Sequence, residues 1–226
     1  MRGKLLKFFL ALTLIFFAGL CARYALAGYF YQSAKDRYSL LTTTETLNVK
    51  ELKSIIAVLD NALSYRAEHA NALDLSADLL YQLWWISPDG QYLHQSNYLQ
   101  KALELHLKSQ KIRHHWSYSA ARIALIYSHQ HLPNKNFSHW FYESHRLGLY
   151  ETDIALSLAE LGLQNWSYLT GKEITLTTDF IRVSIEQKKN SPKSMAQLLR
   201  KYKKHAQLCA VLLSTNRKNE MCAMPL

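Results

Sequence analysis

The sequence predicts an all-α protein in which an N-terminal transmembrane helix precedes a series of paired helices. Three observations support this fold class. An apolar run lies near the N-terminus, between positions 5 and 22. Only seven glycines and four prolines interrupt 226 residues, and the prolines fall between periodic stretches or at their edges. Apolar residues in those stretches recur every three or four positions, which is the spacing of one face of an α-helix.

The apolar run Leu5–Ala22 is preceded and entered by basic residues, and Arg23 ends it. Its length corresponds to about 27 Å of helix, close to a hydrocarbon core of about 30 Å. The positive N-terminal end is expected to stay in the cytoplasm. We therefore expect residues 1–31 to form a signal anchor, in a single-pass protein of the bacterial inner membrane whose body faces the periplasm.

A cleaved signal peptide is the alternative interpretation of this segment. Ala25–Ala27 has the small-x-small form of a cleavage site, and cleavage there would leave Gly28 as the first residue. The length of the apolar run, and the apolar residues that continue past Arg23, favour the anchor. A buried core helix is the other alternative, but core helices of this length usually contain polar interruptions.

The segment 32–47 is expected to link the anchor to a helical-repeat domain at 48–170. Asn48 and Glu51 have the spacing of a capping box that opens the first helix of this domain. Periodic apolar residues then predict further helices, and a seventh helix is less certain because Lys172–Thr177 could also form a strand. The first six apolar stripes begin at Leu52, Ala70, Leu99, Ala120, Phe137 and Ile154.

The segment 171–226 is expected to be a basic helical extension. Pro192 suits the first position of its last helix, because the N–H group that proline lacks has no partner there. Between Arg182 and Lys218 the chain has ten lysines or arginines and one acid, Glu186. Such a tail could meet anionic lipid headgroups or an acidic glycan, or could be a solvated helix face.

The predicted helices are grouped in pairs. Similar junctions centred on Arg66, Arg113 and Gly148 each follow one helix and open the next, at spacings of 47 and 35 residues. The second spacing is close to the 34 residues of a tetratricopeptide repeat, and the first contains an insertion at Trp85–Ser96. Such pairs would stack into a short solenoid whose concave face binds a partner. A non-repetitive helical bundle is the alternative.

No sequence motif predicts catalysis, a cofactor or a metal site. The chain has no Gly-x-Ser-x-Gly sequence and no glycine-rich phosphate loop. His129 and His131 lie near His139, but they lack the carboxylate-backed spacing of metal ligands on one helix face. We expect a protein that is not an enzyme; a glycan-modifying enzyme is the alternative, and it would need two carboxylates at a set separation.

The cysteines allow one disulfide in the body. Cys209 and Cys222 could form a bond that ties the C-terminal tail to the last helix, because the expected compartment is oxidising. Cys21 lies within the apolar run. The spacing of the three cysteines does not indicate a zinc site.

Five short segments of the chain carry a resemblance to a known family: Ala62–Arg66, Lys111–Tyr118, Leu147–Glu151, Glu160–Trp166 and Ala206–Cys209. They resemble the VpsP-type family of polysaccharide biosynthesis proteins, whose plan is an N-terminal membrane segment followed by tetratricopeptide-like helical pairs. The residues that this resemblance marks as helix-packing motifs are Arg66, Arg113, Trp116, Gly148, Gly162 and Trp166.

The resemblance implies an accessory role in the synthesis or export of an exopolysaccharide. It supplies no catalytic residues, so the implied activity is protein–protein interaction with subunits of a synthesis or export complex. The membrane is expected to be contacted through the N-terminal helix. An acidic glycan is the partner in the alternative in which the body is a periplasmic binding protein. Nucleic acid is not expected as a partner, because the body would lie outside the cytoplasm.

Overall fold

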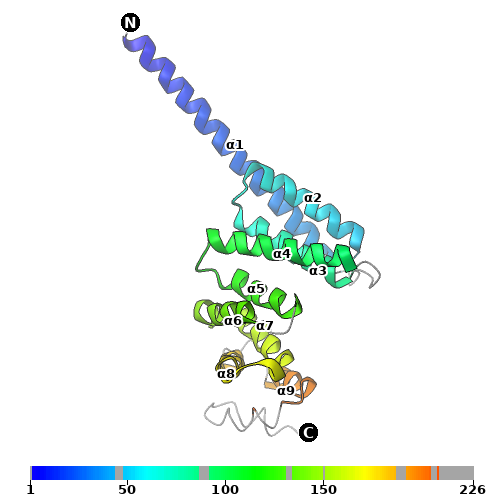
Figure 1. The fold of residues 1–226 in the computed structure, drawn as a ribbon. Coiled ribbons are helices and arrows are strands. Elements are labelled where there is room, and N and C mark those ends of the chain that lie inside the picture. The colour runs from blue at the N-terminus through cyan, green and yellow to red at the C-terminus, as the bar shows by residue number, and fades with distance from the viewer. Residues whose placement is uncertain are drawn as a thin grey trace. The chain divides into compact units, whose positions relative to one another are not determined.

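All regular structure in the described part of the chain is helical (Figure 1). The computed structural model describes residues 2–43, 48–86, 92–130, 134–149, 151–186, 192–204 and 208. The predicted all-α class is therefore confirmed. The helices are α1 (Arg2–Thr43), α2 (Val49–Tyr65), α3 (Ala70–Ile86), α4 (Tyr92–Ile112), α5 (Ser117–Gln130), α6 (Lys135–Gly148), α7 (Thr152–Gln164), the 3₁₀ turn η2 (Trp166–Tyr168), α8 (Gly171–Glu186) and α9 (Pro192–Lys201).

The helices belong to two compact units, which are Met1–Arg113 and His114–Leu226. In the first unit α1 packs on α2, α3 packs on α4, and both α1 and α2 contact α3. In the second unit α5 pairs with α6 and α7 with α8, while α5 contacts α7, and α6 contacts both α7 and α8. Consecutive helices therefore form pairs, as the sequence junctions predicted.

The first helix is longer than the sequence predicted. Residues 32–43, which were expected to be a linker, continue α1. Ala27 and Ala34 are fully buried, and because they are seven residues apart they lie on one face of the helix. These small side chains let other helices of the first unit approach α1 closely, so the body begins inside α1 rather than after it.

Asparagine side chains fix the starts of two helices. Asn48 Oδ1 accepts a hydrogen bond from the Lys50 N–H at 2.8 Å. The sequence predicted this cap, but with the amide of Glu51 as the donor. Asn134 Oδ1 caps α6 by accepting from two amides, one of which is the Phe137 N–H at 3.1 Å. Both caps satisfy amides that have no partner inside the helix.

Helix α8 is part of the core of the second unit and not a separate extension. Its residues Leu176, Phe180 and Val183 are buried in that core. The stretch that could have formed a strand is helical, because Glu173 Oε2 accepts from the Thr170 N–H at 2.7 Å and the Thr170 hydroxyl at 2.9 Å. This is the reciprocal half of a capping box. The boundary expected at 170/171 lies within the second compact unit.

Apolar residues spaced from Met195 to Leu212 predict a long last helix, but α9 ends at Lys201. Lys203 has a left-handed backbone with φ of 56°, and the Lys204 N–H donates to the Leu199 carbonyl at 2.8 Å. A left-handed residue with this hydrogen bond ends a helix, so α9 does not continue into the basic tail. Cys209 and Cys222 lie outside the described residues, and their disulfide stays a prediction.

Two glycines of the motif set lie where helices approach each other closely. A Cβ atom at Gly148 would overlap the side chain of Ser117 on α5, and one at Gly162 would overlap the side chain of Thr177 on α8. Ser117 and Thr177 are both fully buried, so neither has room to move. These glycines therefore set how closely the paired helices pack.

Alanine at Gly148 or Gly162 should destabilise the second unit. Overpacking a filled core costs about 1–3 kcal/mol, against about 1 kcal/mol that alanine gains over glycine within a helix. We expect the free energy of unfolding to fall by up to about 2 kcal/mol, measured by denaturant titration of the detergent-solubilised chain with circular dichroism. Gly171→Ala is the matched control, because no atom lies within 4 Å of its added Cβ. An unchanged midpoint for both core variants would contradict this packing role.

Candidate functional site

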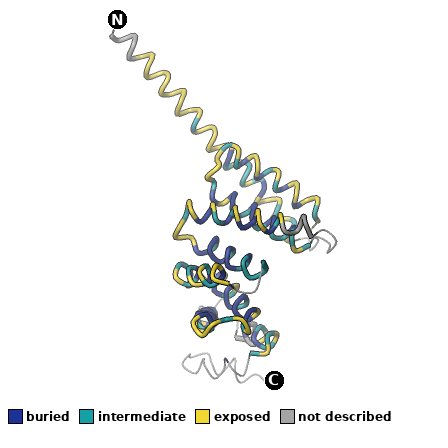
Figure 2. The backbone as a smooth tube through the Cα atoms, in the orientation of Figure 1, coloured by how far each residue is buried: buried dark blue, intermediate teal, exposed yellow. Residues whose placement is uncertain are grey.

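The first half of α1 is apolar and exposed (Figure 2). Its large side chains from Phe8 to Phe17 are 47–69% exposed. The apolar window of this helix has a mean hydropathy of 1.9 and no buried residue. Helix α1 is therefore long and apolar enough to cross a membrane.

The end of this apolar half is fixed to the junction between α2 and α3. Arg23 donates to the Tyr65 carbonyl at 3.1 Å, at the C-terminus of α2. A cation at this end of a helix is favourable, because the helix dipole is negative there. The Arg66 guanidinium lies 4.7 Å from the centre of the Tyr24 ring, in a cation–π contact. The two contacts hold the α2–α3 junction beside the point where the apolar run ends.

Aromatic residues extend this attachment along α1. The Phe30 ring stacks on Tyr65 with 5.8 Å between ring centres, and the Tyr31 ring lies 4.9 Å from that of His69. Both rings of α1 therefore pack on the body. Tyr29, by contrast, is 67% exposed.

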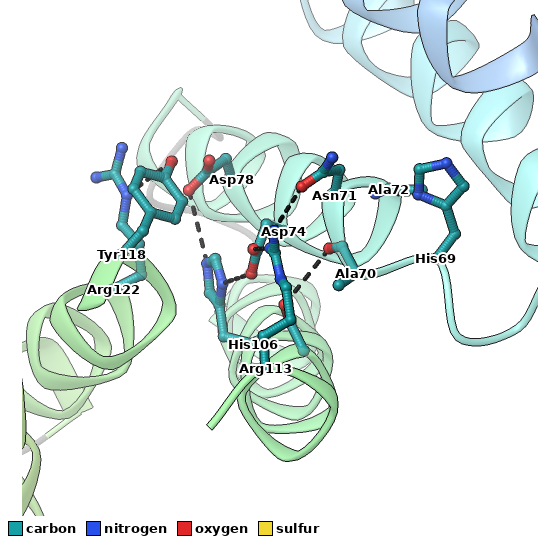
Figure 3. Close-up of polar contacts among 11 residues, drawn as sticks. His69, Ala70, Asn71, Ala72, Asp74, Asp78, His106, Arg113, Tyr118 and Arg122 are labelled. Carbon is teal, nitrogen blue, oxygen red and sulfur yellow. Dashed lines mark hydrogen bonds and ion pairs between the residues drawn. The ribbon is translucent and has the colours of Figure 1, made fainter. Parts of the chain in front are cut away.

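A buried polar cluster joins α3 to α4 in the first unit (Figure 3). The His106 cluster consists of Asp74 and Asp78 on α3, His106 on α4, and Arg113 just after α4. His106 Nδ1 lies 3.0 Å from Asp74 Oδ1, and His106 Nε2 lies 3.6 Å from Asp78 Oδ1. Arg113 donates to Asp74 Oδ2 at 2.5 Å and to Asn71 at 2.7 Å.

Helical spacing brings these groups together. Asp74 and Asp78 are four residues apart and share one face of α3, while His106 and Arg113 are seven apart and share one face at the end of α4. Burial by itself lowers the pKa of His106, but the hydrogen bonds and negative charges of Asp74 and Asp78 outweigh it and raise the pKa above its ordinary value. The imidazolium form is therefore favoured inside the unit.

The His106 cluster acts as a structural tie rather than a reaction centre. His106 is only 1% exposed, and both of its ring nitrogens face carboxylates of α3. A substrate would have no access to either nitrogen. Among the described residues no group of His, Cys, Asp and Glu is arranged to hold a metal ion. The sequence placed His106 on an apolar stripe; the missed signal is the pair of acids within the apolar sequence of α3.

The six motif residues do not converge on one site. Arg66 and Arg113 lie in the first unit, where burial and then the charges of these two arginines lower the pKa of His69. Trp116 precedes α5 and is 41% exposed. Trp166 is partly buried against the core of the second unit, and the Lys204 ammonium lies 5.3 Å from the centre of its ring. Gly148 and Gly162 are the packing positions described above.

A cleft of about 680 Å³ lies in the second unit, between the beginnings of α6 and α8. Lys135, His139 and Tyr142 line it from α6, and Lys172 and Glu173 line it from α8. None of these residues was singled out as a binding residue from the sequence. They come from segments about 30 residues apart, so only the packing of α6 on α8 brings them together. No protein-family model and no curated protein sequence matches the chain.

The raised pKa of His106 makes the stability of the first unit depend on pH. The carboxylates stabilise the imidazolium fully below the unfolded pKa of about 6.5, and this stabilisation is lost as the pH rises through the higher folded pKa. We expect the melting temperature of the wild-type chain to fall, relative to that of His106→Gln, as the pH is raised above the unfolded pKa of about 6.5.

The comparison of the two chains removes the other titrations, because His69 and His129, whose pKa values burial lowers, are present in both. Circular dichroism melts in one detergent at constant ionic strength give the difference at each pH. A difference that stays constant as the pH is raised above about 6.5 would show that the pKa of His106 is not raised in the folded chain.

Proposed function

We propose that this chain is a single-pass membrane protein that presents stacked helical hairpins to protein partners in the synthesis or export of an exopolysaccharide. The observation that supports the membrane role is the continuity of α1, whose exposed apolar half and body-packed half form one helix. The pathway rests on the resemblance of the junction segments to the VpsP-type family. The proposed role is accessory and non-enzymatic.

The contacts of α1 with the body favour a retained anchor over a cleaved signal peptide. Ala27, the last residue before the predicted cleavage site, is fully buried. Cleavage after it would also remove Arg23 and Tyr24, which contact Tyr65 and Arg66. A mature chain beginning at Gly28 would expose part of the surface of α2 that these residues cover.

The proposed anchor fixes the first unit at the membrane instead of tethering it loosely. No linker intervenes between the apolar run and the packed half of α1. If residues 5–22 span the hydrocarbon, Arg23 and Arg66 lie at the level of the headgroups. The basic residues before the run place the N-terminus in the cytoplasm and the body in the periplasm. Attachment to the membrane raises the effective concentration of the body near membrane-bound partners.

The hairpins supply the proposed interaction surface. Contacts of α5 with α7 and of α6 with α8 are those expected when one helical pair stacks on the next. Large aromatic side chains remain exposed on both units, including Trp85 at 66% and Trp116 at 41%. Exposed tryptophans are typical anchor residues of protein interfaces. These features support binding rather than chemistry.

The proposed function predicts that a strain without this gene makes less surface polysaccharide. We expect the full chain to restore polysaccharide output. Residues 23–226 behind an unrelated cleaved signal peptide should fold, because they keep the α1–α2 contacts, but should restore output poorly because they leave the membrane. Quantification of extracted polysaccharide, with immunoblots for chain level, measures both effects.

A chimera provides the matched control. An unrelated transmembrane helix in place of residues 5–22, joined in frame to Arg23, should restore output because the proposed role of this segment is to anchor a rigid body. Normal output in the deletion strain would refute the pathway. Full restoration by the unanchored chain would refute the membrane requirement.

A further inference from the structure

The cleft between α6 and α8 is rich in positive charge. Lys135 and Lys172 are exposed and line it from opposite helices. Among the side chains that the structure describes, neither ammonium group is paired with a carboxylate. Each lysine lies in the first turn of its helix, where a cation is electrostatically unfavourable. Helix stability therefore does not explain either lysine.

The acidic residue of the cleft wall does not neutralise these lysines. Glu173 is 5% exposed, and its Oε2 already accepts from the N–H and the hydroxyl of Thr170. His139, which is exposed, adds a further group that can donate a hydrogen bond. The groups that the cleft offers to a ligand are therefore mainly cations and hydrogen-bond donors.

An aromatic ring accompanies the cations. Tyr142 is 41% exposed in the cleft wall, and the Lys172 ammonium lies 4.3 Å from the centre of its ring. This cation–π contact holds a flexible lysine in a defined position. A simple anion needs cations and amides but makes no use of an exposed ring. A ligand with both a negative charge and an apolar C–H face uses the whole set.

We propose that this cleft binds an acidic sugar unit of a saccharide. The lysines receive the anionic group, Tyr142 packs against the C–H face of the sugar ring, and Ser138 and His139 hydrogen-bond to hydroxyls. The volume of about 680 Å³ is within the range of small-ligand clefts, about 300–1,000 Å³. This binding activity is separate from the proposed interaction with protein subunits and does not depend on it.

Calorimetric titration of the full chain, in nanodiscs of zwitterionic lipid, tests the proposal. The probes are trigalacturonate, the neutral maltotriose and inorganic phosphate. We expect trigalacturonate to bind and maltotriose not to bind. The double variant Lys135→Met/Lys172→Met should lower the affinity about tenfold or more, since it removes both charge-assisted contacts to the anionic group. Tyr142→Ala should lower it roughly fivefold without changing the net charge.

The control is Lys53→Met/Lys108→Met, which makes the same change in net charge at two exposed lysines of the first unit and should leave the affinity unchanged. Melting curves establish that each variant is folded. For Lys135→Met/Lys172→Met we expect a folded chain because methionine removes an unfavourable charge from each helix start.

Three results would overturn the proposal. These are no binding of trigalacturonate by the wild-type chain, equal losses in the cleft and control variants, and phosphate binding that matches trigalacturonate and is indifferent to Tyr142. The last result would describe a simple anion site. Polysaccharide output in the complemented strain is a separate measurement, so failure here is distinguishable from failure of the proposed function.

Discussion

The packing of α1 on α2 is the constraint on which the first unit depends. The first half of α1 is apolar and exposed and its second half packs on the body, and the change occurs within a few residues around Arg23. Before this position large apolar side chains are exposed, whereas after it the small residues Ala27 and Ala34 are buried. Any break in the helix here would separate the apolar run from the body. Contacts of Arg23 and Tyr24 with the end of α2 act against such a break.

The interior of the first unit contains a buried ion-pair cluster, whereas that of the second depends on close apolar packing. In the first, a buried imidazole is matched by two carboxylates, and a guanidinium closes one side of the cluster. Removing one partner from such a group leaves an uncompensated buried charge, which costs about 3–5 kcal/mol. In the second, the helix pairs approach through Gly148 and Gly162, and the aromatic side chains of Phe137, Phe141 and Phe180 fill the core. The first arrangement specifies one register through charge, and the second does so through shape.

Periodicity predicted the helices well because it is a local property. Leu52 and Phe137, for example, begin predicted stripes and are both fully buried. The wrong predictions concern where a helix ends, which depends on backbone geometry or on packing against another helix. The end of α9 depends on the backbone of Lys203, and the linker expected at 32–47 is largely helix because alanines serve as a packing face. The spacing of apolar residues reveals neither a left-handed backbone residue nor a packing face made of alanines.

The sites were much less predictable than the helices. Asp74 and His106 are 32 residues apart, and Lys135 and Lys172 are 37 residues apart, so each pair meets only through the packing of two helices. A polar residue on an apolar stripe signals a buried partner, but it does not say which residue that partner is. Nothing in the sequence indicated the cleft, because lysines at helix starts cannot be distinguished from ordinary surface charge.

The junctions show why the pairing of helices leaves only a weak pattern in the sequence. Arg66, Arg113 and Gly148 occupy corresponding positions, each at the end of one helical pair. Yet Arg66 lies over an aromatic ring, Arg113 pairs with a buried carboxylate, and Gly148 leaves room for a neighbouring side chain. Each junction ends one helical pair and starts the next. A different type of contact stabilises each of the three junctions. The pairing of consecutive helices is therefore what recurs, and the residues at each junction reflect the local neighbours.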